Sequence, residues 1–397
     1  MTLRVGIIGG GMVGFAYAVA IRLACADSYV RIYEARELPN GTPDPLDTRA
    51  SALNLRSREL LAAWGVWDSL VAEAGTIAHI HVSNQHRFGS TLMHAADVDS
   101  DALGFVVENH TIGRALKKRA EALGVEVVAP AVVAKLQLGE QTTLLFEEGA
   151  QETVDWAIVA DGAGSGIRQQ LGIELDRRPT GQRALVFNGS FEGGAVETAY
   201  ERFTPEGPLA VLPLPASGTG KRFNVVWSMH KARAEALESA DDSALMAELQ
   251  RAFGWRQGKV LALGKRSGWD LERVRSTEQF RGNALLVGNA AHGLHPVAGQ
   301  GLNLSLREAG LLQQLLLQTS APLAVTPLIR RYVEQVTAWQ SRVIGATDLL
   351  SNLFNERGAL LDWPRNAALA GLDLIPGARR VIAQQGTGGD PAVVSGT

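Results

Sequence analysis

The sequence has one cysteine, no long apolar run and no excess of basic residues, and each shortage excludes a class of protein. Because Cys25 is alone, no disulfide can form within the chain, which is typical of a reducing compartment. No stretch of about 18 or more uncharged apolar residues occurs, so no transmembrane helix is expected. The formal net charge of −3 leaves no basic surplus for phosphates, which argues against a nucleic-acid partner. We therefore expect a cytoplasmic globular protein.

Glycine, by contrast, is abundant, and its first cluster predicts a dinucleotide site. An apolar strand pattern at 3–8 is followed by Gly9-x-Gly11-x-x-Gly14 and then by an alanine-rich helical pattern. In such a unit the first glycine permits a tight turn and the second lets backbone N–H groups approach a pyrophosphate. The third allows close packing of helix on strand. A second strand pattern ends on Glu34, which is placed to accept hydrogen bonds from an adenosine ribose. This unit alone does not distinguish NAD from FAD.

Two further positions are candidates for the same ligand. The apolar strand pattern at 156–160 ends in Asp161-Gly162, which places a carboxylate at the carboxyl edge of a parallel sheet, where ligands bind. The alternative is that Asp161 only caps the next helix. Arg49 lies where a proline-rich loop meets a helix predicted at 57–74, and it either reaches the pyrophosphate or is solvated surface.

Residues 288–310, "GNAAHGLHPVAGQGLNLSLREAG", contain two histidines and a Gly-Gln-Gly sequence at 299–301. A metal site at His292 and His295 is disfavoured, because Gly293 and Pro296 interrupt any helix and no cysteine or carboxylate ligand lies close in sequence. A simple proline turn before a core helix is a second interpretation. The third is a cofactor loop, because a helix predicted at 302–317 begins without an acidic cap and so presents N–H groups to an anion.

One extended ligand would contact all of these segments. NAD would not need a loop at 288–303, whereas the isoalloxazine ring of FAD would. The dipole of the helix after this loop would stabilise negative charge near N1 and the C2 oxygen of the ring. The residues that we assign to the cofactor are Gly9, Gly11, Gly14, Glu34, Arg49, Asp161, Gly162, Asn289, Pro296, Gly299, Gln300, Gly301, Leu302 and Asn303. No catalytic side chain and no metal ligand is assigned.

Together these motifs resemble the class A flavoprotein monooxygenases of the aromatic hydroxylase type. Within that class, the stretch "GNAAHGLHPVAGQGLNLSLRE" looks like the ubiquinone-biosynthesis hydroxylases, of the 2-polyprenyl-6-methoxyphenol hydroxylase type. Asn289 stands where the wider class has aspartate, and Glu308 replaces an aspartate of this group. "DTRASAL" (47–53), "TDLLSNLF" (347–354) and "GLDLIPGARRVIAQQG" (371–386) extend the likeness over nearly the full chain.

The resemblance implies that NAD(P)H, as a transient co-substrate, reduces bound FAD. O2 then forms a C4a-hydroperoxyflavin that hydroxylates a polyprenylated phenol. It also implies a dry apolar pocket and no metal. His295 is a candidate for the base that deprotonates the phenol, the alternative being a structural turn histidine. The substrate partitions into membranes, so a peripheral contact at the inner membrane face and a quinone-biosynthesis complex are implied partners. Residues 374–385 would make that contact, unless they form an ordinary packed helix.

The predicted fold class is α/β: a Rossmann-like FAD-binding domain interleaved with an antiparallel β-sheet substrate domain, plus C-terminal helices. We expect the FAD-binding domain at 1–75, 101–182 and 276–345. The substrate domain comprises a hairpin at 76–100 and a sheet at 183–275. C-terminal helices occupy 346–386, and a disordered tail occupies 387–397.

Three other functions compete with this one. A flavin hydroxylase acting on a small soluble aromatic acid would need an arginine facing the flavin, for which Arg202 and Arg222 are candidates. A polyprenyl reductase would deliver hydride without oxygen. A non-catalytic FAD-bearing scaffold of a quinone-synthesis complex would need neither an arginine facing the flavin nor the delivery of hydride.

Overall fold

A parallel sheet of the Rossmann type forms the centre of the FAD-binding part. The computed structural model describes residues 2–38, 49–85, 90–215, 220–293, 300–319 and 323–355. Neighbouring strands follow the order β19-β20-β12-β1-β2-β8, in which only β19 runs antiparallel. Their bounds are β1 Arg4–Ile8, β2 Tyr29–Tyr33, β8 Glu126–Val128, β12 Trp156–Val159, β19 Phe280–Arg281 and β20 Ala284–Leu286. Strand β1 is the switch point at which the order of the strands reverses, the usual position of a ligand in such sheets.

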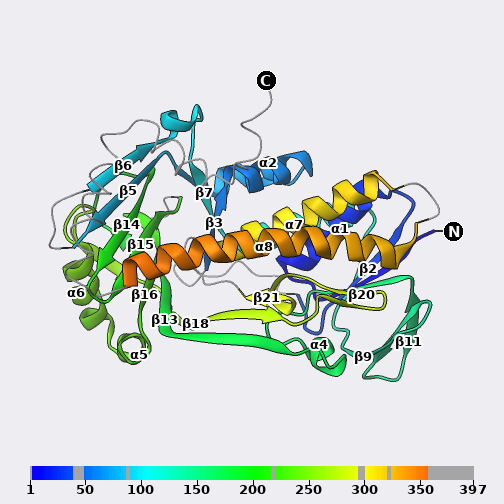
Figure 1. Cartoon of the computed structure of the whole chain (residues 1–397). Coiled ribbons are helices and arrows are strands. Elements are labelled where there is room, and N and C mark those ends of the chain that lie inside the picture. The colour runs from blue at the N-terminus through cyan, green and yellow to red at the C-terminus, as the bar shows by residue number, and fades with distance from the viewer. Residues whose placement is uncertain are drawn as a thin grey trace.

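Helices cover one face of this sheet and a small antiparallel sheet covers the other (Figure 1). The helical side consists of α1 Met12–Ala24, α3 Asn109–Ala122, α7 Gln300–Leu317 and α8 Val325–Asn355. The opposite side consists of β9 Val133–Gln137, β10 Thr142–Phe146 and β11 Gln151–Val154. Alternation along β2 explains the two layers: Val30 and Ile32 pack with the helices, whereas Tyr33 packs with β9–β11.

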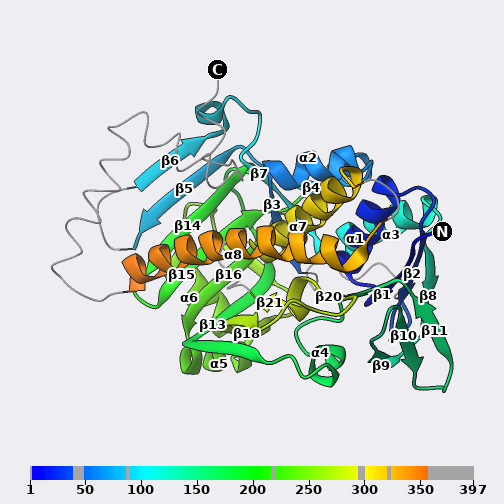
Figure 2. The ribbon, with the colours of Figure 1, turned by 45° about the vertical axis from the view of Figure 1, so that its right-hand side comes forward.

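The second part is a large antiparallel sheet, with order β21-β18-β13-β16-β15-β14-β5-β6 and with β17 paired to β13. Its strands are β5 His79–Asn84, β6 Ser90–His94, β13 Leu175–Phe191, β14 Thr198–Thr204, β15 Gly207–Pro213, β16 Lys221–His230, β17 Val260–Leu263, β18 Ser267–Ser276 and β21 His292–Gly293. Helices α5 Lys231–Ser239 and α6 Asp242–Phe253 bury one face of it. Figure 2 shows the β5–β6 hairpin beside β14, so early residues complete a sheet that forms later in the chain.

A third antiparallel sheet, of β3 Ala50–Asn54, β7 Gly104–Glu108 and β4 Ala74–Ile77, links the two parts. Its residues Ala50 and Val106 share an apolar cluster with Ala199 and Leu212 of the large sheet. The short helices α2 Leu55–Ala63 and α4 Gly166–Gln170 complete the described elements that concern the site.

The predicted fold class is confirmed, but several local expectations were wrong. The helical pattern at 57–74 gives α2 only to Ala63, because Gly65 has φ +70° and the chain continues as two 3-10 turns. Helix α5 and strand β3 were not predicted. The expected boundaries at 182/183 and 345/346 lie within the continuous elements β13 and α8, and the division into domains stays a prediction. The expected tail at 387–397 and most of 346–386 lie outside the described residues.

None of the helices in the described part of the chain is both long and apolar enough to cross a membrane.

Candidate functional site

Most of the described cofactor residues lie along one edge of the parallel sheet. Strands β20, β12, β1 and β2 are neighbours and parallel, so their carboxyl ends lie in order along this edge. Beyond them follow Asn289, Asp161, Gly9 and Glu34, respectively. With strands about 4.8 Å apart, the row spans roughly 14 Å, which suits an extended ligand rather than a compact one.

The glycine loop after β1 combines close packing with open space. Gly9 has φ +110°, and a Cβ there would lie 2.4 Å from the Ala160 oxygen. A Cβ on Gly14 would lie 2.0 Å from the Gly9 oxygen, so the third glycine is what lets α1 approach the loop. Gly11 differs, because nothing lies within 4 Å of its added Cβ. It caps α1 without a side-chain hydrogen bond, and the first turn of α1 has no acidic residue. The exposed N-terminus of α1 therefore fits a pyrophosphate.

Glu34 is held directly against this loop. Its Oε2 accepts a hydrogen bond from the Gly10 N–H at 2.7 Å, and its Oε1 accepts one from the Arg36 N–H at 3.1 Å. Each carboxylate oxygen can accept a second bond, so the ribose contact that we predicted stays available.

Asp161 leaves one oxygen without a protein partner. Its Oδ1 is buried and accepts no hydrogen bond from the residues that the structure describes, while Oδ2 lies 3.5 Å from the Ile167 N–H. Burial raises the pKa of this carboxyl, and the Ser165 hydroxyl partly opposes the shift. The N-cap of α4 is Ser165, whose hydroxyl accepts from the Arg168 N–H, and Asp161 adds only the long contact to the Ile167 N–H of the first turn. Gly162, with φ +90°, also has open space around it.

The N-terminus of α7 provides a second anion-binding helix end. Helix α7 packs on α1 and begins at Gln300, two residues earlier than predicted, with no acidic residue in its first turn. An added Cβ on Gly301 would meet nothing within 4 Å. The backbone N–H groups of Gly301 and Leu302 belong to the first turn, where no helical carbonyl accepts them. Pro296 and Gly299, and with them His295, lie outside the described residues.

Asn303 is used differently from what we expected. Its Oδ1 accepts from the Asn54 N–H at 3.0 Å and its Nδ2 donates to the Ala52 oxygen at 2.7 Å. Both ends of the amide thus connect α7 to the backbone of β3. Asn289 is the opposite case, because it is exposed on a 3-10 turn with φ +56° at Gly288 before it. The structure therefore gives Asn303 a positioning contact and leaves Asn289 accessible.

We expect the two amides to respond differently to replacement by alanine. Asn289→Ala should weaken FAD binding about threefold to tenfold, the effect of one lost hydrogen bond, and leave stability unchanged. Asn303→Ala should cost about 1–3 kcal/mol of unfolding free energy, because two partly buried backbone groups lose their partner. FAD titration and urea unfolding of both variants measure these effects. Equal losses of stability would mean that Asn289 also has a structural contact.

Arg49 lies immediately before β3, not before a helix. Its Cζ lies 5.1 Å from the centroid of the Trp269 ring of β18, and its backbone oxygen accepts from the Asn109 N–H. The side chain is exposed and stacked on the substrate sheet. Its reach to the pyrophosphate stays a prediction.

A buried polar chain behind the loop was not anticipated. His292 Nε2 lies 3.0 Å from Glu308 Oε2, and Glu308 Oε1 accepts from Gln340 at 2.8 Å. Gln340 in turn accepts from Gln279 at 2.6 Å. His292 and Glu308 are 2% and 1% exposed, so the pair is enclosed by protein. No group of three or more His, Cys, Asp or Glu side chains in the described ranges is arranged to hold a metal ion.

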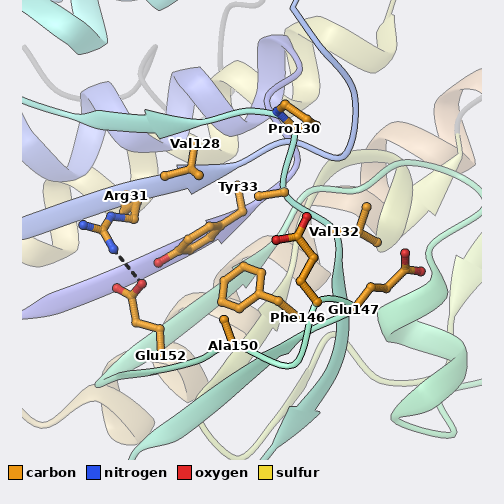
Figure 3. A pocket seen from close by; sticks show the side chains of 11 residues that line it. Arg31, Tyr33, Val128, Pro130, Val132, Phe146, Glu147, Ala150 and Glu152 are labelled. Carbon is orange, nitrogen blue, oxygen red and sulfur yellow. Dashed lines mark hydrogen bonds and ion pairs between the residues drawn. The ribbon is translucent and has the colours of Figure 1, made fainter.

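A separate cavity of about 290 Å³ lies on the other face of the parallel sheet, against β9–β11. Figure 3 shows the Tyr33 and Phe146 rings next to each other in it, with the Arg31–Glu152 ion pair at one end. Because Tyr33 points away from α1, this cavity lies on the opposite face of the sheet from that helix.

The site combines two helix N-termini that have no acidic residue in their first turn, a carboxylate after β2 and the unpaired oxygen of Asp161. These are the features of a dinucleotide site in a fold of the flavoprotein class. The family model described as "FAD binding domain" matches residues 2–347. The chain belongs to this family, and FAD is its cofactor. The predicted class, an FAD-dependent monooxygenase, is also confirmed, and NAD(P)H is the co-substrate typical of the family.

Relatives and solved structures agree with this assignment. The chain is 30% identical to ubiquinone hydroxylase UbiL of Rhodospirillum rubrum over 96% of this chain and 89% of that protein. It is 29% identical to 3-demethoxyubiquinol 3-hydroxylase of Escherichia coli, covering 92% and 93% of the two chains. In fold it is similar to HpxO of Klebsiella pneumoniae in complex with FAD, with a TM-score of 0.77 at 17% identity, covering 98% and 100%.

Proposed function

We propose that the protein hydroxylates a polyprenylated phenol in ubiquinone biosynthesis, with 2-polyprenyl-6-methoxyphenol as the substrate. The names of the relatives support a ubiquinone precursor, because two of them are hydroxylases of such compounds. The chemistry that FAD supplies when bound is the transfer of electrons from NAD(P)H to O2 and of one oxygen atom to the ring. The protein has to hold the cofactor, position the phenol and exclude water.

The observation that carries the proposal is the state of the two arginines that a carboxylated substrate would need. Arg222 on β16 faces the FAD-binding part, but its guanidinium forms an ion pair with Glu108 at 2.5 Å, and both side chains are largely buried. Its charge is therefore already matched within the protein. A second carboxylate from a substrate would have to compete with Glu108 at a high desolvation cost.

Arg202 is turned away from the FAD-binding part. Its Nε donates to the Ala252 oxygen of α6 at 2.9 Å, and Nη1 lies 3.4 Å from Ser83 Oγ. It follows Glu201 on β14, so the alternation of the strand places it on the helical side of the sheet. Neither arginine is positioned to receive an aromatic acid, which favours a neutral phenol over the small-acid alternative.

The expected result is therefore selective turnover of neutral phenols. FAD-loaded protein should consume NAD(P)H and O2 with 2-methoxy-6-methylphenol and release a product heavier by one oxygen. With 4-hydroxybenzoate the specificity constant should be lower by at least about tenfold, or about 1.4 kcal/mol. Oxygen and NAD(P)H consumption with mass spectrometry of the product provide the measurement.

The alternatives predict other outcomes. Preference for 4-hydroxybenzoate would favour the small-acid hydroxylase. NAD(P)H oxidation that continues without O2 would favour the reductase, and a protein that binds FAD but oxidises no NAD(P)H would favour the scaffold. A peripheral membrane contact and a quinone-biosynthesis complex remain part of the proposal because the substrate carries an apolar chain. Residues 374–385, the proposed contact, lie outside the described residues.

A further inference from the structure

One row of side chains crosses the large sheet on the face opposite to α5 and α6. Cross-strand pairing aligns its members from β5 to β18, and we call it the Glu201 row. It consists of Val82, Glu201, Ala210, Val226, Val186 and Ser267. The face follows from strand alternation, because Tyr200, Val225 and Leu185 next to these residues belong to the core under the helices.

This row stays partly accessible, as do Phe203, Pro208 and Leu212 beside it, while several other flanking residues are buried. All six members have intermediate exposure. On one side Ala199, Asn224 and Asn188 are at most 4% exposed. On the other side Ser228 and Ala184 are 2% and 0% exposed. The row is thus an accessible apolar strip with one ionisable side chain, as expected where an aromatic ring lies against a sheet.

The row borders the FAD-binding part. Its neighbours Ala199, which is buried, and Leu212, which is partly buried, share an apolar cluster with Ala50 of β3. The backbone of this strand binds Asn303 at the start of α7. Along the same face of β16, Arg222 reaches Glu108 at the end of β7. The strip therefore lies on the side of the large sheet that adjoins β3, the strand to which the start of α7 is tied.

The carboxylate of Glu201 has no partner among the described side chains. On the strands beside it, the ionisable residues point to the other face: His79 and His81 of β5, and Tyr200 and Arg202 of β14. Strand β15 has no ionisable residue. Arg222 shares the face but is two strands away and paired. Withdrawal from water raises the pKa of Glu201 to about 7, with no charged neighbour involved.

We propose that Glu201 is the general base that ionises the phenol, an inference that rests on the proposed function. The O–H bond of the phenol breaks, its proton passes to a Glu201 carboxylate oxygen, and the electron pair stays on the phenolate. A phenolate ring is more electron-rich and therefore better prepared for hydroxylation. Glu201 thus takes the role for which His295 was the only earlier candidate. A base with a pKa near the working pH is the most effective one.

The test compares Glu201→Gln with wild type and with Glu197→Gln, a control on the exposed glutamate just before the same strand. Using FAD-loaded protein and 2-methoxy-6-methylphenol, kcat for hydroxylation should rise with pH through about 7 in wild type and in the control. In Glu201→Gln, kcat should be lower by about 10²-fold to 10⁴-fold, and its rise with pH should disappear. The phenol Kd, measured by perturbation of the flavin absorbance, should change less than about twofold. Glu201→Asp should keep the rise of kcat with pH, at a lower kcat.

A second series separates a base from a packing residue. Ring-fluorinated phenols, which ionise more easily, should restore the rate of Glu201→Gln progressively but affect wild type little. The assignment of Glu201 would be overturned if Glu201→Gln lost the same fraction of the hydroxylation rate with every phenol. It would also be overturned if the pH profile of kcat in this variant were that of wild type. A wild type that hydroxylates no phenol would overturn the proposed function and this inference together, whereas a fully active Glu201→Gln variant overturns the inference alone.

Discussion

Gly11→Val is expected to abolish FAD retention while the protein still folds. The Gly11 backbone, at φ −82° and ψ 178°, is an extended conformation that valine adopts readily, and an added Cβ has nothing within 4 Å. The new side chain would instead occupy the space through which a pyrophosphate approaches the N-terminus of α1. We expect FAD affinity to fall by about 100-fold or more, and unfolding free energy of the apoprotein to change by less than about 0.5 kcal/mol.

Two other glycines make this result specific. Gly14→Val should fail to fold, because its Cβ alone would lie 2.0 Å from the Gly9 oxygen. Gly193→Val, in open space in the bend that follows β13, should fold and retain FAD. Flavin absorbance after gel filtration and thermal unfolding of the apoproteins would measure the three variants. A yellow Gly11→Val protein with wild-type affinity would show that the pyrophosphate does not lie at this loop.

Glu308→Leu should have the largest effect on stability. The carboxylate accepts from Gln340 at 2.8 Å and lies 3.0 Å from His292 Nε2, in a region where Glu308 is 1% exposed. Removing one member of a buried pair leaves the others without partners, and we expect a loss of about 3–5 kcal/mol in unfolding free energy. Urea unfolding would measure it, with the exposed Glu334→Leu on α8 as a control that changes by less than about 0.5 kcal/mol.

A double variant tests the origin of this loss. In His292→Leu/Glu308→Leu the imidazole that the first change leaves unpaired is also removed, so part of the stability should return. If the double variant lost as much unfolding free energy as the two single variants together, the two side chains would stabilise the protein independently. That result would contradict the pairing as the source of the effect.

Much of the cofactor site could be predicted because its signals are local. Strand, glycines and helix follow each other within residues 3–24, and a parallel strand followed by Asp161 or Glu34 places a carboxylate at the sheet edge by geometry alone. Helix starts are also local, so α7 was misplaced by only two residues. The error at 57–74 arose because helical periodicity continues past Gly65, whereas the backbone does not.

The side chains that decide the chemistry could not be assigned in this way, because their partners are distant in sequence. Arg222 was a candidate anion site until its pairing with Glu108, 114 residues away, became visible. Asn303 was expected at the flavin, yet its amide contacts Ala52 and Asn54, about 250 residues earlier. Glu201 attracts no notice in "TAYERFT", since its isolation follows from Val82 and Ala210 beside it.

The sequence by itself therefore determined the cofactor, the enzyme class and the order of the strands that form the sheet edge. These depend on backbone conformation and strand order, which short patterns encode. The tertiary structure decided which charged groups are already neutralised and which remain available, because pairing and desolvation depend on side chains that only the folded sheet brings together.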